Sequence, residues 1–190
     1  MTAPAPPVRR FGQSALRTPA NMVTIGRLLL AGPSLVLVHR DGATWATVGL
    51  WFVLSMSDLA DGYLARREGT TRSGAFLDPI ADKVLVLGAL WVLAGRGDVP
   101  WAPFVVISAR ELAISAVRGV AGRRGVSMPA RRLGKYKTFL QNSAIGFVLL
   151  PWTARYVGFQ ETVLWAAVAF TVVSGADILL NMARRDDAER

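Results

Sequence analysis

Six long apolar stretches, separated by short polar links, constrain the fold of this sequence more than any other feature. Each stretch is about as long as the roughly 20 residues that a helix needs to cross the hydrocarbon core of a bilayer. The links are rich in Gly, Pro and Asp, which end helices. The sequence therefore predicts an all-α, polytopic membrane protein with six transmembrane helices. The predicted helices cover residues 22–38, 44–65, 75–94, 99–120, 133–157 and 161–182.

The two ends of the chain are predicted to be short additions to one membrane domain. Residues 1–20 are rich in Pro and Ala and then basic, without a convincing cleavage site for a signal peptide. Within them, the segment from Val8 to Leu16 is predicted to form a short amphipathic helix on the membrane surface, and the alternative for residues 1–7 is a disordered tail. Residues 21–183 form the predicted six-helix domain, and residues 184–190 form a cytosolic tail.

The basic residues are distributed unevenly between the two ends of the predicted helices. The chain has 22 Lys and Arg against 13 Asp and Glu, which gives a net charge of +9. With both termini in the cytosol, only Arg40, Arg96 and Arg155 fall on the far side, and Arg110 lies near mid-membrane. The sequence therefore predicts a protein of the inner membrane with cytosolic termini. The same distribution disfavours a nucleic-acid binder, because the basic residues flank apolar spans and form no basic face.

Four aspartates, at the adjoining ends of the second and third predicted helices, are the candidate chemical site. Asp58 and Asp61 are three residues apart, and Asp78 and Asp82 are four apart, so each pair lies on one helix face. An ionised Asp inside a bilayer costs about 2.5–3.5 kcal/mol on insertion scales, and four together repel one another. Since a whole protein is stable by only about 5–15 kcal/mol, packing alone does not explain such a group.

Bound divalent cations would remove this electrostatic cost. The chain has no Cys and a single His, His39, so a ligand set at this site would consist of carboxylates. Carboxylate oxygens suit hard ions such as Mg²⁺ or Mn²⁺. Two such ions, about 4 Å apart, can hold a phosphoryl centre and its leaving group.

Small and basic residues near the aspartates fit a bound phosphate compound. Gly62 and Ala65 leave space for a ligand to approach the helix. Arg66 has a guanidinium fork that suits a pyrophosphate, and Gly74 is expected to let the chain turn into the third helix. The alternative for any one of these residues is a helix end with surface charges and small residues that permit close packing.

The order of these residues resembles the signature of the CDP-alcohol phosphatidyltransferases. The interval from Arg66 to Gly74 is one residue shorter than the usual family pattern, and the difference falls in the loop. The resemblance implies that the protein moves a phosphatidyl group from CDP-diacylglycerol to a small alcohol. It also implies that the aspartates bind metal and that Asp82 in addition acts as the general base. The matching pattern is Asp58-x2-Asp61-Gly62-x2-Ala65-Arg66, then Gly74-x3-Asp78-x3-Asp82.

The resemblance also implies a binding site for the CDP part of the lipid. Residues 20–24, which lead to Arg27, resemble the start of the family's first helix beside the nucleotide and contribute Asn21 and Thr24. For Asn21, an N-cap of that helix is the alternative. The remaining residues implied in CDP binding are Gly62, Ala65, Arg66, Thr71 and Gly74.

Within the family, the chain most resembles the branch whose acceptor is glycerol 3-phosphate. The supporting strings are LDPIADK, ARELAISAVR and GKYKT. They imply that Arg110, Arg118, Lys135 and Lys137 bind the acceptor phosphate. The alternative for Arg110 and Glu111 is an ion pair between helices, because an unpaired charge within an apolar helix is expensive. The alternative for the other three is anchoring to anionic lipid headgroups.

Other functions remain open at this point. The alternative acceptors for the same reaction are inositol phosphate and phosphatidylglycerol. A small cation transporter also fits six helices and buried acids, but it does not explain Gly62, Ala65, Arg66 and Gly74. The predicted partners are CDP-diacylglycerol, glycerol 3-phosphate and membrane lipids, with two Mg²⁺ or Mn²⁺ ions. The resemblance further suggests a homodimer, and no nucleic-acid partner is expected.

Overall fold

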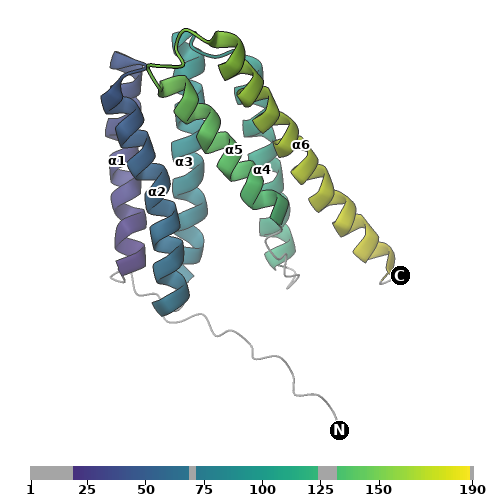
Figure 1. Cartoon of the computed structure of the whole chain (residues 1–190). Helices are drawn as coiled ribbons and strands as arrows, with labels where there is room; N and C mark the ends of the chain where they lie inside the picture. Colours follow the sequence, from purple (N-terminus) through teal and green to yellow (C-terminus); the bar gives the residue numbers. More distant parts are fainter. Residues whose placement is uncertain (1–18, 69–71, 124–131, 189–190) are drawn as a thin grey trace.

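Six long helices make up the described part of the chain, and the predicted all-α class is confirmed (Figure 1). The computed structural model describes the backbone of residues 19–68, 72–123 and 132–188. Within them it describes the side chains of residues 21–57, 77–122, 134 and 136–182. The predicted surface helix from Val8 to Leu16 lies outside these residues. The helices are α1 (Pro19–Asp41), α2 (Trp45–Glu68), α3 (Arg72–Arg96), α4 (Trp101–Arg123), α5 (Arg132–Leu149) and α6 (Val157–Ala188).

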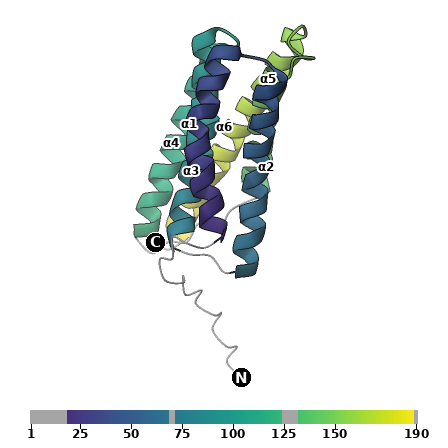
Figure 2. The same ribbon diagram turned by 90° about the vertical axis from the view of Figure 1, so that its left-hand side faces the viewer.

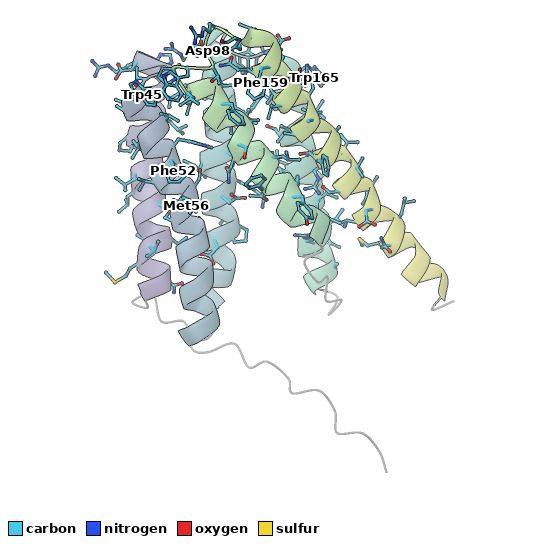
Figure 3. All side chains as sticks on the ribbon, in the orientation of Figure 1. Trp45, Phe52, Met56, Asp98, Phe159 and Trp165 are labelled. Atoms are coloured by element: carbon cyan, nitrogen blue, oxygen red, sulfur yellow. The ribbon has the colours of Figure 1, made fainter. Side chains whose placement is uncertain are left out.

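The helices run alternately up and down, so that the same end of the bundle holds the start of α1 and the end of α6 (Figure 1). Helices α2 and α4 end and helices α3 and α5 begin at this end, which we call the motif end. The α1–α2, α3–α4 and α5–α6 connections lie at the opposite end, where Trp45 and Asp98 are found (Figure 3). The aspartate-bearing segments of α2 and α3 therefore both lie at the motif end.

Contacts between helices that are distant in sequence hold the bundle together. Helix α1 packs against both α2 and α3, and Figure 2 shows α1 lying directly in front of α3. Helix α5 packs against α2, α3 and α6, while α4 packs against α3 and α6. The core is a continuous set of buried apolar side chains from all six helices. Its largest members include Leu54, Leu90, Ile107, Ile145 and Leu164.

Many large apolar side chains point away from this core. Leu29, Phe52, Trp91, Phe139 and Leu180 are all exposed. Contiguous exposed apolar surface is rare on a monomeric soluble protein and is expected where lipid covers it. Among the described residues, α1 from Asn21 to Asp41 and α6 from Val157 to Met182 are long and apolar enough to cross a membrane by themselves.

Two glycines with positive φ end helices at the opposite end. Gly42 (φ 63°) follows α1, and its N–H donates to the carbonyl of Val38 at 2.9 Å. Gly97 (φ 82°) follows α3, and the next N–H, that of Asp98, donates to the carbonyl of Leu93 at 2.9 Å. Glycine suits both positions because other residues rarely adopt this backbone conformation.

The boundary between the last two helices differs from the prediction. Helix α5 ends at Leu149 instead of residue 157, because Pro151 has no N–H to donate to the carbonyl of Phe147. That carbonyl accepts instead from the hydroxyl of Thr153 and from Nε2 of Gln160 at 3.2 Å. Helix α6 starts at Val157, four residues earlier than predicted, and continues to Ala188, so residues 184–188 of the predicted tail are helical.

Candidate active site

The four aspartate positions lie at matching distances from the α2–α3 turn. Asp58 is ten residues before the end of α2, and Asp82 is ten residues after the start of α3. At 1.5 Å per residue, both lie about 15 Å along their helices from the turn. Asp61 and Asp78 lie about 10 Å and about 9 Å from it. The helix bounds therefore put the four positions at two matched distances from the turn, and the convergence of their carboxylates at one membrane depth stays a prediction.

The connection between the two helices is short enough to keep these positions near one another. Only residues 69–71 separate α2 from α3, and four steps of extended chain span at most about 14 Å. The side chains of Asp58 and Asp61 are outside the described set. The predicted CDP-binding side chains of α2 and of the start of α3 are also outside the described set. Neither the backbone nor the side chain of Thr71 is described. Gly74 is inside α3, which begins at Arg72, earlier than the predicted residue 75.

Helix α1 contacts both halves of the aspartate motif through buried polar side chains. Thr24 is fully buried, and its Oγ1 donates to Oδ1 of Asp78 on α3 at 2.6 Å. Arg27 is 3% exposed, and its Nε donates to Oγ of Ser57 on α2 at 3.1 Å. Ser57 directly precedes Asp58. Helix α1 thereby connects the segment before Asp58 to the carboxylate of Asp78.

Asn21 belongs to the same face of α1. Asn21, Thr24 and Arg27 follow one another at intervals of three residues, and all three side chains are buried. We call these three residues the α1 polar face. Helix α1 begins at Pro19, so Asn21 lies inside the helix, and the alternative reading of Asn21 as an N-cap is wrong. A buried polar face on an apolar helix is expected to serve a polar site.

The donor chemistry at this end of the bundle fits a hard divalent cation. Asp78 and Asp82 lie one turn apart on α3, and both are partly buried. The hydrogen bond from Thr24 orients the Asp78 carboxylate, as residues behind a metal ligand commonly do. Among the described side chains, no group of three or more His, Asp or Glu is close enough to hold a metal.

A second buried polar group joins α4, α5 and α6. Oε1 of Glu111 accepts from Nζ of Lys137 at 2.6 Å and from Nη1 of Arg110 at 2.7 Å. Nη2 of Arg110 donates to Oγ of Ser174 at 2.8 Å. We call these four residues the Glu111 network. The predicted alternative for Glu111, an ion pair between helices, is confirmed.

Asp82 on α3 is within electrostatic reach of Lys137 in the Glu111 network. The negative charge of Asp82 acts electrostatically on Lys137, together with the charges of Glu111 and Arg110. Arg118 is exposed on α4, two turns closer to the motif end than Glu111. The side chain of Lys135 is outside the described set. Of the four basic residues predicted to bind the acceptor, the structure brings Arg110 and Lys137 together.

Sequence reasoning missed three polar residues of this region. Gln141, one turn after Lys137, donates from Nε2 to Oγ1 of Thr171 at 2.8 Å. Ser174, one turn after Thr171, accepts from Arg110. The available signal was helical spacing, because polar residues three or four apart within an apolar span share a face. All three side chains are buried and connect α6 to α4 or α5.

Comparison with known proteins identifies the family of the chain. Residues 17–173 match the CDP-alcohol phosphatidyltransferase family, and the chain belongs to that family. It is therefore a metal-dependent phosphatidyltransferase of phospholipid biosynthesis and a polytopic membrane protein. This confirms the predicted family, and it leaves the readings as a cation transporter or a nucleic-acid binder without support.

Several relatives are similar to the chain over most of its length. A probable phosphatidylglycerophosphate synthase of Mycobacterium tuberculosis H37Rv is 37% identical over 179 residues, covering 91% of this chain and 85% of the relative. A CDP-diacylglycerol–glycerol-3-phosphate 3-phosphatidyltransferase of Bacillus subtilis 168 is 39% identical, covering 79% and 77%. An enzyme with the same description from Rickettsia typhi is 34% identical, covering 82% and 91%.

Proposed function

We propose that this chain transfers the phosphatidyl group of CDP-diacylglycerol to glycerol 3-phosphate and releases CMP. The product is phosphatidylglycerophosphate. The observation that carries the proposal is the Glu111 network, within electrostatic reach of Asp82, because two cations and one carboxylate leave an excess of positive charge for the phosphate of the acceptor. The descriptions of the relatives favour glycerol 3-phosphate over other phosphate-bearing acceptors.

Metal binding is assigned to Asp58, Asp61, Asp78 and Asp82 in this proposal. Two ions, Mg²⁺ or Mn²⁺, would supply charge neutralisation for the pyrophosphate when bound. Thr24 contributes by holding Asp78 in one orientation. The CDP part of the lipid is bound by the residues that the family resemblance implies, namely Asn21, Thr24, Gly62, Ala65, Arg66, Thr71 and Gly74.

The chemical step requires a base and a leaving group. Asp82 accepts the proton of the sn-1 hydroxyl of glycerol 3-phosphate. The hydroxyl oxygen forms a new bond to the phosphorus attached to diacylglycerol, and the bond from that phosphorus to CMP breaks. Arg66 neutralises charge on the departing CMP. Lys137, with Arg110, Arg118 and Lys135, binds the phosphate of the acceptor, and the described contacts support Lys137 best.

The motif end is assigned to the cytosolic side of the inner membrane. The basic residues concentrate at this end, as the positive-inside rule requires of a cytosolic face. Both substrates are then reached from the cytosol or the inner leaflet. The predicted homodimer stays a prediction.

An acceptor assay tests the proposed function. Purified protein in detergent micelles receives CDP-diacylglycerol, Mn²⁺ or Mg²⁺, and one acceptor at a time: glycerol 3-phosphate, inositol phosphate or phosphatidylglycerol. We expect CMP and phosphatidylglycerophosphate with glycerol 3-phosphate and at least about a hundredfold lower kcat/KM with the others. Turnover with another acceptor but none with glycerol 3-phosphate would reject the proposal.

A further inference from the structure

Glu111 binds two cations through one carboxylate oxygen, which is more than an ion pair between helices needs. Lys137 on α5 and Arg110 on α4 both donate to Oε1. Glu111 is 8% exposed and Lys137 is 6% exposed. A buried ion pair contributes little to stability, since apolar residues of similar size are often as good or better. The network therefore calls for a role beyond holding helices together.

Arg110 is held in place by two other members of the Glu111 network. Its Nη1 donates to Glu111 and its Nη2 to Ser174. Its Nε is buried and makes no hydrogen bond within the described residues. A Cβ added to Gly175 on α6 would lie 3.0 Å from that Nε, so α6 confines the guanidinium closely.

Lys137 makes fewer hydrogen bonds within the described residues than Arg110 does. An ammonium group has three N–H donors. Within the described part of the chain, Lys137 makes one hydrogen bond, to Glu111. Its remaining donors suit an anion, and the charge of Asp82, the proposed base, acts on the same ammonium group. Lys137 therefore combines a fixed position, spare donors and an electrostatic interaction with the proposed base.

We propose that Glu111 is a positioning residue that sets the place of Lys137 and thereby the place of the acceptor phosphate relative to Asp82. Arg110 supports Glu111 in this role, because its contacts with Ser174 and Glu111 fix the Glu111 carboxylate against α6. The inference rests on the proposed function and deepens it: specificity for a phosphate-bearing alcohol is built into α4, α5 and α6, while α1, α2 and α3 hold the nucleotide end.

Steady-state kinetics of Glu111→Gln provide the main test, because this change keeps the side-chain shape and removes the charge. We expect the KM for glycerol 3-phosphate to rise about tenfold while the KM for CDP-diacylglycerol stays within about twofold. Glu111→Asp restores the carboxylate and is expected to recover most of the affinity for the acceptor. Equal increases in both KM values, or a lower kcat with unchanged KM values, would show a merely structural role.

Gln141→Leu is the matched control. It removes a buried hydrogen bond to Thr171 on α6, one turn from Lys137, without touching the Glu111 network. We expect a lower unfolding temperature with an unchanged KM for glycerol 3-phosphate. If this control raises the acceptor KM as much as Glu111→Gln does, general loosening of the helices explains the effect and the inference fails.

Two further measurements keep the test decisive. Ser174→Ala releases Arg110 without leaving a charge unpaired, so it remains informative even if Glu111→Gln does not fold; we expect a rise of about threefold in the acceptor KM. The double variant Glu111→Gln/Lys137→Met is expected to have an acceptor KM no higher than that of Lys137→Met alone. Fully additive effects, or an unchanged KM in Ser174→Ala, would overturn the inference. Inactivity of the wild-type protein with glycerol 3-phosphate would instead reject the proposed function.

Discussion

At the scale of single residues, the hydrogen bond from Thr24 to Asp78 gives α1 a part in the proposed metal site. We expect Thr24→Val to weaken Mn²⁺ binding about tenfold, because residues that orient a ligand typically contribute 10- to 100-fold to metal affinity. Thr24→Ser keeps the hydroxyl and is the matched control. Mn²⁺ binding is measured by electron paramagnetic resonance on purified protein without substrate. Equal affinities of the Val and Ser variants would exclude a role for the hydroxyl.

Asp82 is the residue on which the proposed chemistry depends most. Asp82→Asn should lower kcat about a thousandfold, since a positioned general base typically contributes between 10²- and 10⁴-fold. Asp177→Asn is a suitable control, because Asp177 is another acid within an apolar helix and hydrogen-bonds Asn181 at 2.9 Å. The Asp177→Asn variant should keep a normal kcat. Near-normal turnover by Asp82→Asn in the acceptor assay would refute the base assignment.

At the scale of helices, α1 and α3 approach each other closely at a glycine. A Cβ on Gly88 of α3 would lie 2.6 Å from Cδ1 of Leu35 on α1. We expect Gly88→Ala to destabilise the bundle by about 1–3 kcal/mol, the usual cost of overpacking. Thermal unfolding followed by the fluorescence of the six Trp residues measures this change.

Gly49→Ala is the control for this packing prediction. Gly49 is also helical, but it is exposed and a Cβ there meets no atom within 4 Å. It should be neutral or slightly stabilising, since Ala has the higher helix propensity. A second variant, Leu35→Ala combined with Gly88→Ala, should recover part of the lost stability. If the two glycine variants unfold at the same temperature, the close approach of α1 and α3 is not limiting.

At the scale of the whole molecule, the two ends of the bundle differ in chemistry. The opposite end has paired aromatic rings, such as Trp45 with Trp152 at 5.4 Å, as expected at a membrane–water interface. There, Arg96 ion-pairs with Asp98 at 2.7 Å and donates to the carbonyl of His39, so it ties the α1 and α3 ends together. At the motif end, by contrast, the proposed metal ions hold α2 to α3.

Metal removal should therefore affect the stability of the whole bundle. We expect EDTA to abolish activity and to lower the unfolding temperature, and Mn²⁺ or Mg²⁺ to reverse both effects, because a ligand that binds only the folded state stabilises it. Asp61→Asn should lose the response to Mn²⁺ while keeping the unfolding temperature of the metal-free protein. A stabilising response of undiminished size in that variant would place the metal elsewhere.

Much of this protein follows from local sequence. The apolar runs predict the six helices, and the spacing of the aspartates predicts two acidic faces, since helix geometry depends on residues within a few turns. The end of α5 was missed because Pro151 acts through the carbonyl of Phe147, four residues earlier, and that effect depends on Thr153 and Gln160 as replacement donors. Helix boundaries depend on such details of hydrogen bonding.

The sequence by itself determined the class of the fold, the acidic motif and the basic end of the bundle, because these depend on the composition and period of single segments. Only the tertiary structure decided that Thr24 bonds Asp78, 54 residues away, and that Glu111 bonds Lys137, 26 residues away. The sequence suggested an interhelical partner for Glu111 without naming it. Partners across helices depend on which helices pack together and at what rotation, and those properties arise from the joint packing of all six.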